Sequence, residues 1–302
     1  MPWFSYHGGH SGEFSRHAAG SLEDVVRSAI RSGFSIYGLS EHAPRYRVED
    51  LFPDEADLGV EDLARTFESY VSTALALRDR YADRIELLVG FESEVLPVQG
   101  WAEQMCELRR RHPEFDYVVG SVHHVGGASI DMTPELTAKV AEEVGGRDAL
   151  ERLYFELVAE MVERLRPEIV GHFDLIRKFE GFGTSFGPGI WKHIERGLEV
   201  MRAVGAILDV NAAPVRRRMG PVYPLPPLLE RACEMGIPVT LGDDSHGPAE
   251  VGVGLGACLQ AIQQAGYHCV HYLTRERGEV HLESAPLDAV RPQLRGERSG
   301  QG

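Results

Sequence analysis

The chain carries, at residues 237–248, the stretch IPVTLGDDSHGP, in which a short apolar run ends in two aspartates and a histidine. Such a run is typical of a buried β-strand, so the polar residues would lie at its carboxyl end. Five other apolar runs end in the same way, and they lead into His7 and His10, Glu41 and His42, Glu92 and Glu94, His123 and His124, and His172 and Asp174. The carboxyl ends of parallel strands meet on one face of a barrel, where catalytic groups collect. His, Asp and Glu clustered on one face are typical ligands of divalent metals, so the pattern indicates a metalloenzyme.

The order of the apolar runs predicts the architecture. We expect seven strands, near residues 3–6, 36–39, 86–91, 117–122, 168–171, 206–210 and 238–241. Amphipathic helical patterns separate them, at residues 21–33, 60–81, 133–167, 191–205, 225–236 and 248–266, and the third of these is interrupted at Gly145 and Gly146. Strands that alternate with helices indicate βαβ units and a parallel sheet. Because no Ser-rich or Gly-rich linker divides the chain, the pattern favours one closed barrel over two domains. We expect that domain to span residues 1–290, with a disordered polar tail at 291–302.

Composition excludes several functions. The 302 residues include 31 Lys and Arg against 46 Asp and Glu, a formal charge of −15. Nucleic-acid grooves and anionic membrane surfaces require a basic face, so we expect neither partner. The four cysteines lie far apart without a CxxC spacing, which is neither a zinc-finger nor a disulfide pattern. We find no signal-peptide pattern and no apolar stretch of membrane-spanning length, and we expect a cytoplasmic protein.

Within the polar clusters some choices stay open. His7, His10 and His17 lie in a glycine-rich segment whose backbone can turn tightly. Either Glu92 or Glu94 could bridge two cations. Only one of His123 and His124 should point toward a metal if the strand continues through them. Each histidine taken singly is more often a core or surface residue than a ligand, but six clusters at predicted strand ends favour a shared site.

Basic residues follow two of these runs and indicate the charge of the substrate. Arg177 and Lys178 come after the fifth strand, and Asn211 ends the sixth strand shortly before Arg216, Arg217 and Arg218. Arginine forks beside a metal cluster suit a phosphate group, so we expect a small anionic phosphate ester as the substrate. The alternative is a solvated basic loop.

Taken in order, the motifs SGEFSRHA, LSEHAPR, GFESE, GSVHH, GHFDLIRK, VNAAPVR and GDDSHGP resemble those of the PHP (polymerase and histidinol phosphatase) superfamily of metal-dependent phosphoesterases. The resemblance runs from His7 to about Gly254 and is nearest to the monofunctional histidinol-phosphatase branch. It implies a distorted (β/α)7 TIM-like barrel with up to three divalent cations (zinc, iron or manganese) at the carboxyl face.

The resemblance also implies roles for particular residues. The first cation would be held by His10, Glu92, Asp244 and additionally His7. Glu92 would bridge to the second, which His123 and His172 complete, and the third would be held by His17, His42 and His246. Arg177 and Arg216 match positions that grip the substrate phosphate.

One spacing departs from the family pattern. The family has H-x-H at the end of the first strand, whereas this chain has His7-Gly8-Gly9-His10. In register with His10, the first histidine is replaced by Gly8. Either a one-residue bulge at the glycines brings His7 to the metal, or the first site lacks a ligand.

The resulting hypothesis is hydrolysis of L-histidinol phosphate to L-histidinol and phosphate. Cations bridged by Glu92 would activate water and neutralise charge on the phosphoryl oxygens. Either Asp243 or His124 would protonate the leaving oxygen, and the sequence does not choose between them. The alternatives are a related phosphoesterase that acts on another small ester or a nucleotide, and a non-catalytic metal-binding barrel. The sequence does not predict an oligomeric state.

Overall fold

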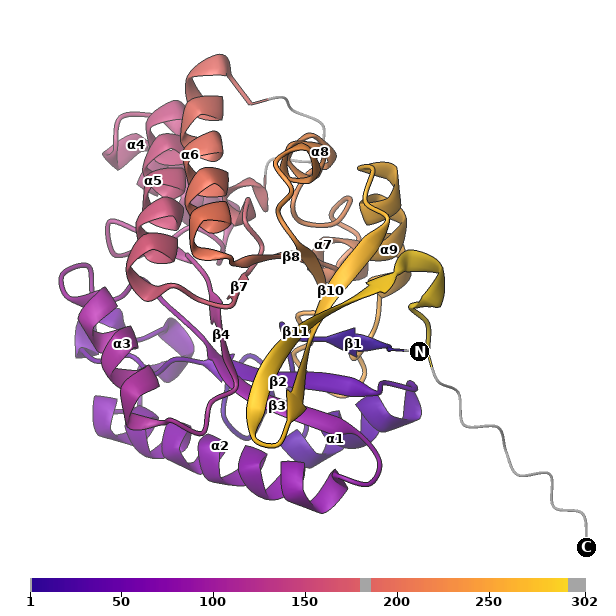
Figure 1. Ribbon diagram of the computed structural model, residues 1–302. Coiled ribbons are helices and arrows are strands. Elements are labelled where there is room, and N and C mark those ends of the chain that lie inside the picture. The colour runs from indigo at the N-terminus through magenta and orange to yellow at the C-terminus, as the bar shows by residue number, and fades with distance from the viewer. Residues whose placement is uncertain (1, 180–185, 293–302) are drawn as a thin grey trace, which may run out of the picture.

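The computed structural model describes residues 2–179 and 186–292. Its centre is a seven-stranded sheet in the order β1-β2-β3-β4-β7-β8-β9, with every neighbouring pair parallel. The amide of Tyr6, just after β1, donates to the Leu241 carbonyl of β9 at 3.1 Å, so the sheet is nearly closed. The predicted α/β class, with a distorted seven-stranded TIM-like barrel in a single domain, is confirmed (Figure 1).

All seven predicted strands are present. They are β1 (Phe4–Ser5), β2 (Ile36–His42), β3 (Glu86–Glu92), β4 (Tyr117–Gly120), β7 (Ile169–Val170), β8 (Ile207–Asn211) and β9 (Val239–Gly242). Nearly all of their residues are buried, as expected for parallel strands covered on both faces. The buried barrel positions are filled mainly by Val, Ile, Leu and aromatic side chains.

Helices connect successive strands and surround the barrel. They are α1 (Leu22–Arg31), α2 (Val60–Tyr81), α3 (Trp101–Arg111), α4 (Pro134–Glu143), α5 (Arg147–Leu165), α6 (Pro188–Val204), α7 (Ala213–Arg216), α8 (Pro226–Glu234) and α9 (Leu255–Gln264). Ser21 caps α1, because its side chain accepts from the Asp24 amide. Gly145 and Gly146 have φ values of 101° and 109° and separate α4 from α5 at the predicted interruption.

Several helices differ from the prediction. The short helix α7 was not predicted, and α6 begins at Pro188 instead of residue 191. Helix α9 begins later than expected, because Gly252 and Gly254 lie in the left-handed region just before it. Helix α3 was not predicted, although Trp101, Met105 and Leu108 have the spacing of a buried helical face and are all buried.

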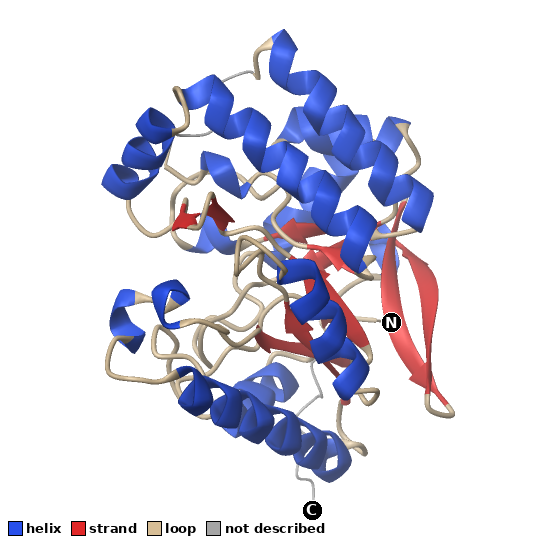
Figure 2. Cartoon of the chain, turned by 90° about the vertical axis from the view of Figure 1, so that its left-hand side faces the viewer, coloured by secondary structure: helices blue, strands red, loops and turns tan. Residues whose placement is uncertain are grey.

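A C-terminal hairpin also was not predicted. Strands β10 (Cys269–Glu276) and β11 (Glu279–Pro286) pair antiparallel. Glu86, the first residue of β3, accepts from the Thr274 hydroxyl at 3.1 Å and from the Arg275 amide at 2.5 Å. The hairpin therefore covers the amino ends of the strands. In Figure 2 it lies on one side of the sheet, and the loops that follow the strands gather on the other.

Short elements complete the loop face. They are η1 (Val48–Asp50) and η2 (Pro53–Glu55) after β2, the small hairpin of β5 (His124–Val125) and β6 (Ala128–Ser129) after β4, and η3 (Leu175–Arg177) after β7. A further turn, η4 (Leu287–Ala289), follows β11. Residues 293–302 of the predicted disordered tail lie outside the described residues, so the domain boundary at residue 290 stays a prediction. No described helix is both long and apolar enough to cross a membrane.

Candidate metal centre

Glu92, the last residue of β3, lies at the centre of the polar cluster. Its Oε1 lies 3.0 Å from His7 Nε2, 3.2 Å from His123 Nε2 and 3.1 Å from His172 Nε2. Its Oε2 lies 3.0 Å from His42 Nδ1, which follows from the β2–β3 register that pairs His42 with Glu92. The carboxylate is 1% exposed. Four strands and the loops after them thus bring histidines to the two oxygens of one buried carboxylate.

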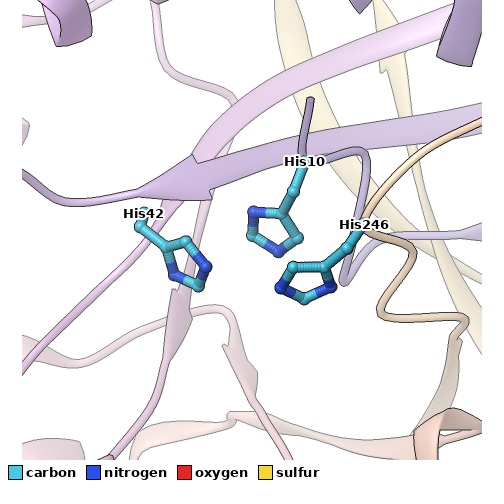
Figure 3. Close-up of side chains that lie close together, drawn as sticks. All are labelled: His10, His42 and His246. Carbon is cyan, nitrogen blue, oxygen red and sulfur yellow. The ribbon is translucent and has the colours of Figure 1, made fainter. Parts of the chain in front are cut away.

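A second group of histidines faces Glu92 Oε2. The His10 ring stacks on His42 with centroids 4.2 Å apart and lies 4.4 Å from the His246 ring. Figure 3 shows the three rings gathered around a common space. His17 reaches the same group from its loop, with its Nε2 3.1 Å from His42 Nε2. This side of the cluster is made almost entirely of imidazole nitrogens.

The glycine pair decides where His7 lies. Gly8 and Gly9 have φ values of 135° and 77°, which side-chain-bearing residues rarely adopt. The extra residue is accommodated in this turn, and both His7 and His10 point into the barrel, 1% and 0% exposed. The turn at the two glycines thus places His7 beside Glu92 in the cluster, and its role as a metal ligand stays a prediction.

Three further carboxylates orient the histidines from behind. Asp209 Oδ2 lies 2.7 Å from His7 Nδ1, and Glu41 Oε1 lies 3.1 Å from His10 Nδ1. Glu94 Oε2 lies 2.9 Å from His123 Nδ1. Such partners fix the tautomer and orientation of imidazoles that ligate a metal through the other nitrogen. Sequence reasoning missed Asp209, which lies inside β8 where a buried carboxylate was the only signal.

The turn after β9 presents Asp244. This residue has φ 49°, in the left-handed region, and Asn211 Nδ2 lies 3.4 Å from its Oδ2. The Arg216 guanidinium donates to the carbonyls of Asp243 and Asp244, the latter at 2.7 Å, and so fastens the turn. The Asp243 carboxylate points away into the barrel wall, where the Tyr37 hydroxyl and the Gly252 amide donate to it at 3.0 and 2.7 Å.

A cavity of about 460 Å³ opens over the cluster. Its described lining includes Glu92, His172 and Asp244 at the base, Phe52, Asp131 and Tyr223 on the walls and the exposed Asp54 at the rim. Lys178 and Arg217 are among its cations. Arg177 and Arg216, the two predicted phosphate contacts, are not among the lining residues. Arg177 is 1% exposed and pairs with Glu151 of α5 at 3.3 Å.

Neither predicted proton donor lines the cavity directly. Asp243 is enclosed as described above. His124 stacks on Phe52, with ring centroids 5.7 Å apart, and its Nδ1 lies 3.1 Å from Glu94 Oε2. Both side chains thus have structural contacts, and their catalytic roles stay predictions.

Burial and neighbouring charges shift the pKa values of the cluster residues in different directions. Burial alone would raise the pKa of Glu92, but His7 and His123 hold it well below its usual range. Burial alone would lower the pKa of His7, but Glu92 and Asp209 raise it well above its usual range. Burial and the neighbouring His10 lower the pKa of His42, and burial with His42 lowers that of His17 to about 3. His17 and His42 therefore favour the neutral form that a metal requires.

The side chains fit divalent cations. Among the described residues, three groups have ligand atoms within 4.8 Å of one another, and they are His7, His10 and Asp244; His7, Glu92 and His172; and His10, His42 and His246. His10 Nε2 and His172 Nδ1 are buried, and neither has a hydrogen-bond partner within residues 2–179 and 186–292. Zinc, iron and manganese are bound by such a set of imidazole nitrogens and carboxylate oxygens, and some of these nitrogens have no hydrogen-bond partner among the described residues.

A nearly closed parallel barrel with such a cluster at the carboxyl ends of its strands defines the class of metal-dependent barrel enzymes. The comparisons with known proteins narrow that class. The chain belongs to the PHP domain family, which matches residues 7–213. It is 39% identical over 264 residues to the protein of Schizosaccharomyces pombe named "Probable histidinol-phosphatase", with 85% of each chain covered.

Two solved structures share the fold. The hisK protein of Listeria monocytogenes superposes with a TM-score of 0.73 at 26% identity, covering 84% of this chain and 98% of that one. The histidinol phosphate phosphatase of Lactococcus lactis, complexed with zinc, L-histidinol and phosphate, gives a TM-score of 0.65 at 19% identity, covering 92% and 98%.

Proposed function

We propose that this chain is a metal-dependent phosphomonoesterase that hydrolyses L-histidinol phosphate to L-histidinol and phosphate. The observation that carries the proposal is the position of Glu92, whose two oxygens face separate histidine groups at the base of one cavity. The family membership and the histidinol-phosphatase name of the S. pombe relative support the choice of substrate.

We assign the metal ligands as three sets, of which the first two share Glu92. The first is His7, His10, Glu92 and Asp244, the second is Glu92, His123 and His172, and the third is His17, His42 and His246. Support comes from the three candidate groups described above, which contain all of these residues except His17 and His123. Those two lie 3.1 Å from His42 and 3.2 Å from His172, measured between Nε2 atoms. Up to three cations of zinc, iron or manganese would suit this donor set.

Divalent cations bound there would supply a nucleophile from water at neutral pH and neutralise charge on the phosphoryl group. The chain's own residues do the rest. Glu92 holds its histidines in one arrangement, Asp209 and Glu94 keep imidazole nitrogens directed inward, and Arg216 fixes the turn that carries Asp244. The basic side chains that line the cavity, Lys178 and Arg217, attract the anionic ester and raise its local concentration.

His172→Ala tests the proposal. Removing this imidazole from Glu92 should abolish phosphate release from L-histidinol phosphate and lower the bound metal per chain, while the circular dichroism stays that of the wild type. His281→Ala, an exposed histidine on β11, is the matched control and should behave as the wild type. Wild-type turnover by His172→Ala would overturn the metal assignment.

The substrate is tested separately. Wild-type protein loaded with zinc, iron or manganese in turn should release phosphate from L-histidinol phosphate with a kcat/KM well above that for nucleotides or glycerol phosphate. A metal-loaded protein that prefers another ester would overturn the substrate but not the chemistry. Absence of turnover on every ester would favour a non-catalytic barrel.

A further inference from the structure

An ion pair on the cavity wall has no part in the metal cluster. Lys178 Nζ lies 3.1 Å from Asp131 Oδ2, and both residues line the cavity. The Ser129 hydroxyl donates to the other oxygen, Asp131 Oδ1, at 3.0 Å and fixes the carboxylate. The side chains are only 14% and 22% exposed. Ion pairs in such partly desolvated places are costly to form, so this one invites a functional explanation.

The chain places this pair beside the second proposed metal set. Asp131 follows the β5–β6 hairpin, which starts directly after His123, and Lys178 follows η3, which starts shortly after His172. The Nε2 atoms of His123 and His172 lie 3.2 Å apart, and both face Glu92 Oε1. The two wall residues therefore extend from neighbouring points at the base of the cavity.

The other carboxylates of the cavity have different surroundings. Glu92 and Asp244 belong to the metal cluster, and Glu94 lies between His123 and His124. Asp54 is 43% exposed on the rim, 4.0 Å from His17 Nδ1. Among the described lining residues, Asp131 is the carboxylate that is part-buried, outside the cluster and paired with a cation. Although burial alone would raise the pKa of Asp131, Lys178 keeps it below its usual range, so the group is ionised.

L-histidinol phosphate carries one positive and one negative group that could pair with Asp131 and Lys178. Its ammonium group and its phosphate ester oxygen are bonded to neighbouring carbons, so a cation and an anion lie side by side. When such a molecule enters, the carboxylate can exchange Lys178 for the ammonium while Lys178 takes a phosphate oxygen. Each buried charge then keeps a partner of opposite sign, whereas an ester without the amine would draw Lys178 away and leave Asp131 unpaired.

We propose that the Asp131–Lys178 pair is the specificity element of the cavity and selects phosphomonoesters of 2-amino alcohols, with Asp131 binding the ammonium and Lys178 the phosphate. This inference rests on the proposed phosphatase function. It assigns a substrate class to the site and a specificity-determining role to Asp131.

The test compares L-histidinol phosphate with imidazolylpropyl phosphate, which lacks only the amine. The metal-loaded wild type should have a higher kcat/KM for the amine-bearing ester than for the ester without the amine. Asp131→Asn keeps the side-chain shape and should lower the ratio of these two kcat/KM values at least tenfold. The loss should come from a higher KM for the amine-bearing ester. Asp54→Asn, the matched change at the other candidate carboxylate, should keep the wild-type ratio. A wild-type ratio in Asp131→Asn, or its loss in Asp54→Asn, would overturn the inference.

A second measurement needs no variant. The wild type should hydrolyse phosphoethanolamine at least tenfold more efficiently than ethyl phosphate, because these esters differ only in the amine. Equal hydrolysis of both would refute the role of the ion pair and leave the phosphatase function intact. Failure of the wild type to hydrolyse any of the four esters would refute the proposed function itself.

Discussion

Replacement of Gly8 by alanine tests the glycine turn that places His7 in the cluster. At φ 135° the backbone of Gly8 is strained for any residue with a side chain. An added Cβ would collide with Asp243 Oδ1 and lie 2.7 Å from the Ser245 amide nitrogen. Backbone strain of this kind costs about 1–3 kcal/mol and overpacking about 1–3 kcal/mol more. We therefore expect Gly8→Ala to lose about 2–6 kcal/mol of unfolding free energy.

The matched control is Gly126→Ala. Gly126 has φ 62°, but an added Cβ would meet no atom of the described part of the chain within 4 Å, so only the backbone cost of about 1–2 kcal/mol applies. At roughly 2 °C per kcal/mol for a chain of this size, the Tm should fall by about 4–12 °C in Gly8→Ala and by about 2–4 °C in the control.

The same collision predicts a loss of metal. The added methyl group would push apart the turn that carries Asp244 and the turn that carries His7. Metal per chain, measured by elemental analysis after dialysis, should fall in Gly8→Ala and stay at the wild-type value in Gly126→Ala. If the two variants had the same Tm and the same metal content, this account of the turn at Gly8 and Gly9 would be wrong.

Three further predictions concern the support of the cluster. Asp209→Asn removes the charge behind His7 and should weaken metal binding about 10–100-fold in a titration against a chelating dye, with unchanged circular dichroism; wild-type affinity would contradict the role of Asp209. Arg216→Gln releases the Asp243 and Asp244 carbonyls, so metal content should fall before any substrate is added. A higher KM at unchanged metal content would instead mean that Arg216 grips the phosphate. Finally, because Glu92 and Asp209 raise the pKa of His7, the metal-free protein keeps this proton to higher pH than a free histidine and loses the associated stability as pH rises through the raised pKa. Metal must displace that proton, so the drop in Tm caused by a chelator should be larger at pH 8 than at pH 6, and an equal drop would refute the linkage.

The cluster could be predicted from the sequence because the carboxyl ends of parallel strands meet on one face of a barrel. In the structure β2 and β3 are neighbouring parallel strands, and their register pairs His42 with Glu92, the last residue of each strand. Roles that depend on the direction of one side chain are a different matter. Arg177 and Lys178 are adjacent in sequence, but the turn of η3 buries the first against Glu151 and directs the second to the cavity. No periodicity distinguishes two neighbouring cations in a short loop.

The features that the sequence did not predict were missed for physical reasons. The β10–β11 hairpin has one exposed face and carries charged residues along it, so it lacks the continuous apolar run that marked the barrel strands. The partner of Asp209 could not be predicted, because His7 lies 202 positions away in the chain. Its role depends on a contact that closes the barrel, and local sequence carries no record of such contacts.

The conformations of the cluster residues explain why this face must be held by so many contacts. His172 and Asp244 both have positive φ values, 23° and 49°, which cost residues with side chains about 1–3 kcal/mol each. Both belong to candidate metal groups, and each lies in the turn that directly follows a strand. A strained turn persists only when its surroundings determine it, and here Arg216 fastens one while the barrel wall encloses the other. Bound cations would add to that support, since they bind the folded arrangement and not the unfolded chain. The glycine pair before His10 acts in the same way, because its backbone conformation, which residues with side chains rarely adopt, brings His7 beside Glu92.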